Sequence, residues 1–192
     1  MSGILAHHPC CQTAAMPELV LPDVRVRESF LEAMREVVTE GNRAEAAYLG
    51  SEQTRYRAGW NSPEGFAEYV ATVRADGAET TPRRIGIVPH TTWWWVDGED
   101  YLGRISVRHR LTDFLRDVGG HVGYYVRPSR RRRGHATAML RAVLPYAADL
   151  GLEQVLITCD DTNEGSRRVI EAVGGVLEDQ RGVKLRYWLP TH

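Results

Sequence analysis

A run of four arginines in the last third of the chain offers the clearest chemistry. Arg130 to Arg133 are followed at once by Gly134, in the segment RPSRRRRGHATAML. Guanidinium groups bind phosphate oxygens in pairs, and a glycine lets the backbone approach a ligand closely. The run is therefore compatible with three interpretations: a nucleic-acid interface, a solvated surface, or a site for a smaller phosphorylated ligand.

The composition of the whole chain weakens the nucleic-acid interpretation. The 192 residues carry a formal net charge of −1, whereas a dedicated nucleic-acid-binding domain usually has a basic excess. No apolar run approaches the ~20 residues of a membrane span, so no membrane partner is expected. The three cysteines show neither metal spacing nor a disulfide framework, which favours a cytoplasmic location.

The length of the chain suits one domain with a short extension. Residues 1–15 lack the charged start and apolar core of a secretory signal, and we expect them to form a flexible tail. Residues 16–192 are expected to form a single domain. The sequence leaves the oligomeric state open, a homodimer included.

Hydrophobic spacing predicts the elements that must position the arginine run. Asp-Gly between β-rich segments predicts a hairpin over 91–111, in which Trp93 and Trp95 share one face and Trp94 the other. The order of helices and strands along the chain predicts a mixed α/β domain, with a right-handed crossover between near-parallel strands. The other predicted elements are strands at 18–23, 121–128 and 154–160, helices at 27–42, 62–77, 134–150 and 163–175, and a closing hairpin.

The join between the strand ending at Val126 and the helix beginning at Gly134 has the features of an anion site. Free N–H groups at the start of a helix bind anions, helped by the helix dipole. The segment is neither a P-loop nor a G-x-G-x-x-G loop, because its pattern is Arg131-x-x-Gly134-x-Ala136. A strand, turn and helix of this kind suit a pyrophosphate.

This pattern resembles the phosphate loop, [RQ]-x-x-G-x-[GA], of the GNAT superfamily of N-acetyltransferases. GYYVRPSRRRRGHATAMLRAVLPYA resembles the family's strand, loop and helix, and VLITCDDTNEGSRRVIEAVGGVLE resembles its next strand and helix, with Asn163 and Ser166 in place. The resemblance covers roughly 91–189, including KLRYWL as the terminal strand. It implies the acyl-CoA N-acyltransferase fold: an α/β (α+β) domain with a mostly antiparallel central sheet, a splay between the strands at 121–127 and 154–160, and about four flanking helices.

The resemblance also implies the reaction and the coenzyme site. Acetyl-CoA would be the cosubstrate, and its acetyl group would pass directly to an amine without a covalent enzyme intermediate or a metal. Backbone groups of Tyr125 and Val126 would pair with the pantetheine arm, beside Asn163 and Ser166. Arg131 occupies the motif position, and the pyrophosphate would be bound by the amides of Arg132, Arg133, Gly134, His135, Ala136 and Thr137. The side chain of His135 is expected to point outward.

The general acid and base are not fixed by the resemblance. Many members carry a tyrosine seven residues after the asparagine, where this chain has Ile170. In this it resembles the branch that includes ribosomal-protein N-terminal acetyltransferases. Three residues are candidates for catalytic roles: His121 as a base on the strand before the loop, His109 facing the acceptor, and Tyr187 as an acid or substrate contact.

The acceptor is the least determined part of the prediction. The leading hypothesis is acetylation of a primary amine on a small molecule. The alternatives are acetylation of a protein N-terminus or lysine, and a CoA-sensing module with reduced catalysis, which the isoleucine at position 170 would suit. A nucleic-acid partner is disfavoured by the neutral charge.

Overall fold

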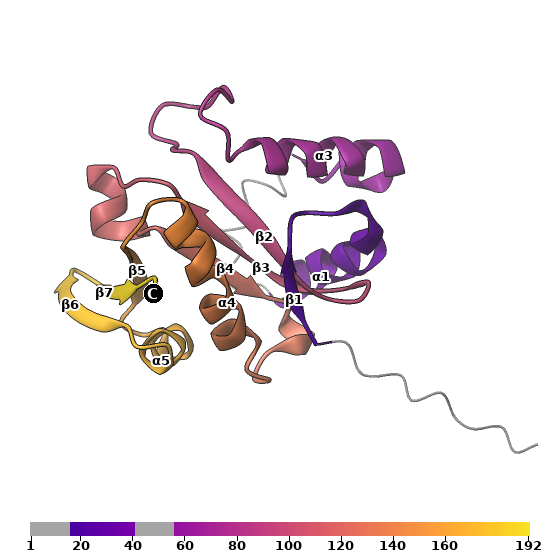
Figure 1. Cartoon of the computed structure of the whole chain (residues 1–192). Coiled ribbons are helices and arrows are strands. Elements are labelled where there is room, and N and C mark those ends of the chain that lie inside the picture. The colour runs from indigo at the N-terminus through magenta and orange to yellow at the C-terminus, as the bar shows by residue number, and fades with distance from the viewer. Residues whose placement is uncertain (1–15, 41–55) are drawn as a thin grey trace, which may run out of the picture.

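The computed structural model describes residues 16–40 and 56–192 (Figure 1). The tail predicted at 1–15 and the end of the first predicted helix, at 41–42, lie outside these residues. The α-helices are α1 (Arg27–Glu40), α3 (Pro63–Ala75), α4 (His135–Asp149) and α5 (Glu164–Ala172). The strands are β1 (Glu18–Val20), β2 (His90–Asp97), β3 (Asp100–Arg108), β4 (Val122–Val126), β5 (Gln154–Asp160), β6 (Val176–Arg181) and β7 (Lys184–Pro190).

Side chains cap two helices where the sequence predicts that they begin. Ser62 accepts a hydrogen bond from the amide of Gly65 at the start of α3, and Pro63 follows it. Asn163 accepts one from the amide of Ser166 at the start of α5. Both contacts satisfy N–H groups that a helix leaves without partners in its first turn. The positions of α3 and α5 therefore follow from local sequence.

The strands form two antiparallel sheets that meet at one point. One sheet has the order β1-β2-β3-β4, and the other has the order β5-β7-β6. The amide of His121, just before β4, donates to the carbonyl of Leu156 on β5 over 2.7 Å. Within the described residues, no backbone hydrogen bond joins the two strands beyond this contact. The splay predicted between these strands is confirmed, and so is the fold class.

Hydrophobic clusters fill both faces of the four-stranded sheet. Trp93 and Trp95 belong to the cluster under α4 and α5, and Trp94 belongs to the cluster under α1 and α3. All three indoles are buried, which confirms the predicted alternation. Around Trp94, the ring of Phe30 lies 5.3 Å away, centroid to centroid. Each face of β2 is therefore part of the core.

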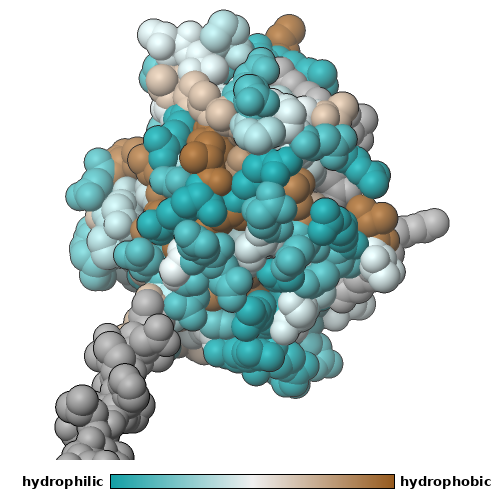
Figure 2. All heavy atoms as spheres, turned by 90° about the vertical axis from the view of Figure 1, so that its right-hand side faces the viewer, coloured by the Kyte–Doolittle hydropathy of each residue, from teal (hydrophilic) through white to brown (hydrophobic). Residues whose placement is uncertain are grey.

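The side of the molecule seen in Figure 2 is mostly hydrophilic, with hydrophobic atoms visible in smaller patches between polar ones. Among the described residues, no helix is both long and apolar enough to cross a bilayer.

Candidate functional site

The inner edge of β4 faces the gap between the two sheets and pairs with no other strand among the described residues. The amide of Arg108 donates to the carbonyl of His121, and the amide of Arg127 donates to Leu102, both over 2.8 Å. Because peptide groups alternate along a strand, the groups of Tyr125 also face β3, and those of Tyr124 and Val126 face the gap. The edge that faces the gap is the edge on which an extended ligand could add hydrogen bonds.

This alternation bears on the backbone contacts expected for a pantetheine arm. The backbone groups of Val126 face the gap, which suits the predicted contact with the pantetheine arm. The carbonyl of Val126 also accepts a hydrogen bond of 3.0 Å from Nε of Arg131. Tyr125 is paired with Arg104 on β3. Its contact with a ligand stays a prediction, and sequence reasoning passed over the neighbouring groups of Tyr124.

The loop after β4 forms a concave array of amides at the start of α4. Arg132 has a φ of 61° and Gly134 a φ of 82°, both in the left-handed region. Successive amides bend toward one point when such residues alternate with ordinary ones, which creates an anion-binding nest. In the part of the chain that the structure describes, no acceptor is found for the amides of residues 132–137 outside helix α4. Arginine rarely adopts a positive φ, so the loop holds a strained conformation of the kind found at ligand sites.

The four consecutive arginines divide into two pairs. Arg130 forms an ion pair of 2.8 Å with Asp100 on β3, and Arg131 donates to the carbonyl of Val126. Arg132 and Arg133 are exposed. The first pair therefore fixes the loop against β3 and β4, and the second pair is available to a ligand.

A fifth arginine, which sequence reasoning missed, anchors the loop to α1. The side chain of Arg127 is 9% exposed, and its Nε lies 2.6 Å from Oε1 of Glu36. Its guanidinium also pairs with Glu32 over 3.0 Å, and the amide of Ser129 donates to Glu36 over 3.0 Å. Burial alone would raise the pKa of Glu36, but the bonds from Ser129 and Arg127 outweigh it and lower that pKa. A charged segment 91 residues away thus holds the base of the loop.

Tyr124 crosses the gap from β4 to α5. Its phenolic oxygen lies 2.6 Å from Oγ of Ser166, whose amide is capped by Asn163. Burial raises the pKa of Tyr124 to about 12, so it remains protonated at neutral pH. The two residues predicted to lie beside the pantetheine, Asn163 and Ser166, therefore lie at this gap, and Ile170 is fully buried behind them. The alternation of a strand, which puts Tyr124 and Tyr125 on opposite faces of the sheet, is a signal that could have indicated Tyr124.

His135 does not point outward. The indole N–H of Trp95 donates to its Nδ1 over 3.3 Å, and the side chain is only partly exposed. Burial and the charges of Arg133 and Arg130 lower the pKa of His135. The expectation failed because the first turn of α4 packs on the end of β2, a long-range contact that helical spacing does not show. The contact predicted for its amide is separate from the side chain and stays a prediction.

The three candidate catalytic residues occupy different surroundings. Nδ1 of His121 accepts the amide of Leu156 over 2.9 Å, and burial lowers its pKa to about 4. Nε2 of His109 lies 2.9 Å from the hydroxyl of Thr91, and burial lowers the pKa of His109 as well. The hydroxyl of Tyr187 donates to Glu171 over 3.1 Å, and burial raises its pKa to about 12. Their catalytic roles stay predictions.

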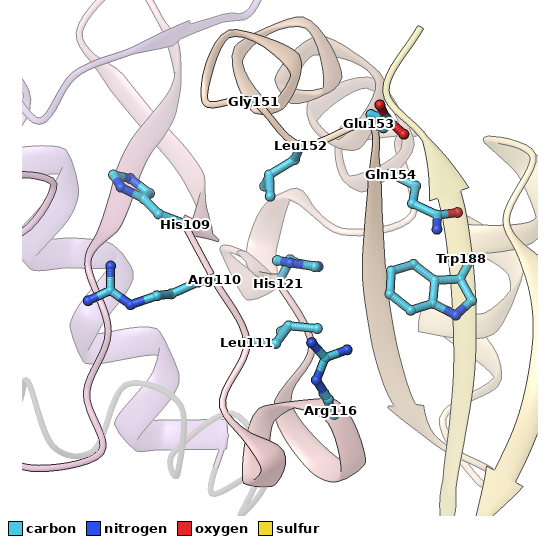
Figure 3. Close-up of a pocket in the computed structure, with 10 residues that line it drawn as sticks. All are labelled: His109, Arg110, Leu111, Arg116, His121, Gly151, Leu152, Glu153, Gln154 and Trp188. Atoms are coloured by element: carbon cyan, nitrogen blue, oxygen red, sulfur yellow. The ribbon is translucent and has the colours of Figure 1, made fainter.

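The structure brings two of these three candidates together. His109 and His121 line the same open cleft (Figure 3), and Tyr187 does not. The cleft lies at the start of β4, whereas the loop of amides comes after the end of that strand. A base role for His121 would require its ring to give up the bond from Leu156, because the other ring nitrogen carries the proton. Among the described residues, no group of three or more His, Cys, Asp or Glu side chains could bind a metal.

Comparisons with known proteins agree with this arrangement. The family model described as "Acetyltransferase (GNAT) domain" matches residues 34–176. A search of curated proteins found no match. Solved structures share the fold at low sequence identity. One is RimL, a ribosomal L7/L12 alpha-N-protein acetyltransferase in complex with coenzyme A, with a TM-score of 0.59, 14% identity, and coverage of 91% of this chain and 93% of that one.

Two further structures extend the likeness. The PaiA N-acetyltransferase from Thermoplasma acidophilum, in complex with coenzyme A, has a TM-score of 0.57 and 10% identity over 91% of this chain and 99% of that one. The microcin C7 self-immunity acetyltransferase MccE, in complex with acetyl-CoA and AMP, has a TM-score of 0.55 and 12% identity, over 90% and 91% of the chains. At these identities the likeness shows the fold alone.

Proposed function

The chain belongs to the GNAT acetyltransferase family, and from this premise we propose that it transfers the acetyl group of acetyl-CoA directly to the primary amine of a small molecule. The observation that carries the proposal is the loop of amides at residues 132–137, which lies between the end of β4 and the first turn of α4. A pyrophosphate on this loop would direct a bound thioester along the open edge of β4. Coenzyme A or acetyl-CoA is present in the three solved structures compared above. We place the reaction in the cytoplasm, in keeping with the cysteine usage.

The charges around the loop suit the negative groups of the coenzyme. The exposed side chains of Arg132 and Arg133 would lie near its phosphates, and the start of α4 adds the positive end of a helix dipole. Arg130 and Arg131 are engaged by Asp100 and by a backbone carbonyl, so they would keep the loop in shape. Most of the binding energy would then come from backbone amides, which is why glycine is needed at position 134.

The gap between β4 and α5 supplies a proton donor for the leaving thiolate. Acetyl transfer to an amine requires the amine to lose a proton, and departure of the thiolate is helped by a proton from the protein. The hydroxyls of Tyr124 and Ser166 lie 2.6 Å apart at the gap, and a phenol with a pKa of about 12 is a donor at neutral pH. We assign the donor to this pair, since the position of the common family tyrosine is occupied by Ile170.

A second candidate function is acetylation of a protein N-terminus. It is favoured by the likeness to RimL, which is described as acetylating a ribosomal protein, and by the Asn163-x-x-Ser166 pattern. A CoA-binding module with reduced catalysis is the remaining alternative. The three functions share the coenzyme site and differ in the step after the coenzyme has bound.

The test is a thiol-release assay with acetyl-CoA, preceded by a thermal-shift measurement. Acetyl-CoA at ~100 times its dissociation constant is expected to raise the unfolding free energy by about 2.7 kcal/mol. Acceptors would be polyamines, amino acids, aminoglycosides and short peptides with free N-termini. Turnover with peptides alone would replace the small-molecule proposal with the second candidate. Binding without turnover on any amine would favour the sensing module, and no thermal shift would reject all three.

A further inference from the structure

A cleft of about 410 Å³ lies at the start of β4, at the opposite end of this strand from the proposed coenzyme loop (Figure 3). It is bordered by the residues that come after β3, by the turn between α4 and β5, and by β7. Leu111, Leu152 and the partly exposed ring of Trp188 form its apolar walls, and the imidazole of His121 lies in the middle of the lining. The cleft is open, and it places apolar side chains beside the buried ring of His121, with charged and polar side chains around them.

The ring of His121 presents a hydrogen-bond donor to this cleft. Its Nδ1 accepts the amide of Leu156 over 2.9 Å, so in the neutral ring the proton is on Nε2. Burial holds the pKa of His121 near 4, which keeps the ring neutral at physiological pH. No acceptor for Nε2 is found among the residues that the structure describes. A ligand bound in the cleft could accept the hydrogen bond of this N–H group in place of solvent.

The charged groups around this donor are predominantly positive. Arg116 and Arg108 are the two charged residues whose fields act on His121, and both disfavour its protonation. Arg108 is engaged by the carbonyls of Gly119 and Gly120, whereas Arg116 is exposed and has no ion pair within the described ranges. Glu153 is the one acidic residue in the lining. The field therefore favours a ligand with one negative charge.

We propose that this cleft binds a small monocarboxylate that carries an apolar or aromatic group. One carboxylate oxygen would accept the Nε2–H bond of His121, and the carboxylate would pair with Arg116 at the rim. The apolar group would pack between Leu111, Leu152 and Trp188. A phosphate is disfavoured, because the carboxylate of Glu153 would repel a second negative charge. The site is separate from that of acetyl-CoA, so the proposal does not depend on the acetyl-transfer reaction.

The experiment is a two-dimensional ¹H–¹⁵N NMR titration of the full chain with sodium phenylacetate, in the millimolar range. The resonances to follow are the indole N–H of Trp188 and the amide of Leu156, which reports on the ring of His121. Saturable shifts of both are expected for the natural sequence. Arg116→Ala should weaken binding about tenfold, as expected for loss of a charge-assisted contact. Arg25→Ala removes a guanidinium beside β1, away from the cleft, and should leave binding unchanged.

Three other ligands and one further variant complete the test. Inorganic phosphate and the neutral 2-phenylethanol should each leave these resonances in place at the same concentrations. Trp188→Leu should weaken phenylacetate more than acetate. The proposal is overturned if phenylacetate causes no saturable shift, if Arg116→Ala binds it as tightly as the natural sequence, or if 2-phenylethanol binds equally well. Stronger binding of phosphate than of phenylacetate would likewise overturn the assignment to a carboxylate.

Discussion

The phenolic oxygen of Tyr124 lies 2.6 Å from Oγ of Ser166, and this contact joins β4 to α5 across the gap between the two sheets. The two residues are 42 positions apart in the chain. Since a single backbone bond, from His121 to Leu156, joins the two strands among the described residues, the hydroxyl pair is a further polar link across the gap. Any ligand that extends along the open edge of β4 has to pass beside it.

Replacement of Tyr124 by phenylalanine tests the proposed proton donor. Tyr124→Phe keeps the ring and removes the hydroxyl, so acetyl-CoA should still bind. Turnover in the thiol-release assay should fall about 100-fold, the lower range for loss of a general acid. Tyr146→Phe is the matched control, because Tyr146 is an exposed tyrosine on α4 that packs on Trp93. Equal turnover of the two variants would remove Tyr124 from the mechanism.

Replacement of Gly134 by glutamate tests the amide loop. Gly134 has a φ of 82° with open space where a Cβ would lie, so the variant places a strained, negatively charged side chain at the phosphate site. We expect the thermal shift with acetyl-CoA to disappear. Gly151→Glu is a matched control at the other end of α4, since Gly151 has the same φ of 82° and the same open surroundings. If the loop assignment is right, Gly151→Glu has a similar backbone strain but keeps the thermal shift with acetyl-CoA.

The anchor between Arg127 and Glu36 should contribute more to stability than the neighbouring ion pair of the loop. Arg127→Gln leaves Glu36 without its charged partner, and we expect the free energy of unfolding to fall by about 1–3 kcal/mol. Arg130→Gln removes the pair with Asp100, whose two side chains are 34% and 49% exposed, and should cost less than about 1 kcal/mol. Urea denaturation measures both, and equal losses would contradict the anchoring role.

His121 should make the stability of the fold depend on pH. The ordinary pKa of 6.5 applies to the unfolded chain, and burial lowers it to about 4 in the folded state. Between these values the unfolded chain binds the proton and the folded chain does not, so stability falls as the pH decreases from 6.5 toward 4, by about 2–3 kcal/mol. His121→Asn keeps an acceptor for Leu156 and removes the titration.

Comparison of the natural chain with His121→Asn by denaturation across that range checks this effect. A difference in the free energy of unfolding that persists above neutral pH would measure packing alone, because the imidazole is then neutral in both the folded and the unfolded chain. The same variant separates two roles of the residue. If His121 is the catalytic base, His121→Asn loses turnover and the lower limb of its pH profile. If the ring serves as a donor to the cleft, turnover is retained.

The elements of the fold could be predicted because their signals are local. Ser62 and Asn163 act within three residues of themselves, and the alternation of Trp93 to Trp95 is a property of any strand. The surroundings of His135 could not be predicted in this way, since its partner is an indole 40 residues away. Arg127 was also missed, because its carboxylate partners on α1 are far from it in the chain.

The sequence by itself determined that an arginine run precedes a helix after a strand, and that glycine stands at position 134. Together these features are sufficient for an anion site, because backbone amides at the start of a helix depend on local conformation alone. Only the tertiary structure decided which arginines remain available. Three of the five arginines in and before the loop are engaged: Arg130 by Asp100, Arg131 by the carbonyl of Val126, and Arg127 by the carboxylates of α1. The packing of α1 and β3 around the loop places these acceptors there. The position of Tyr124 opposite Ser166 depends likewise on the divergence of two strands, which no local pattern determines.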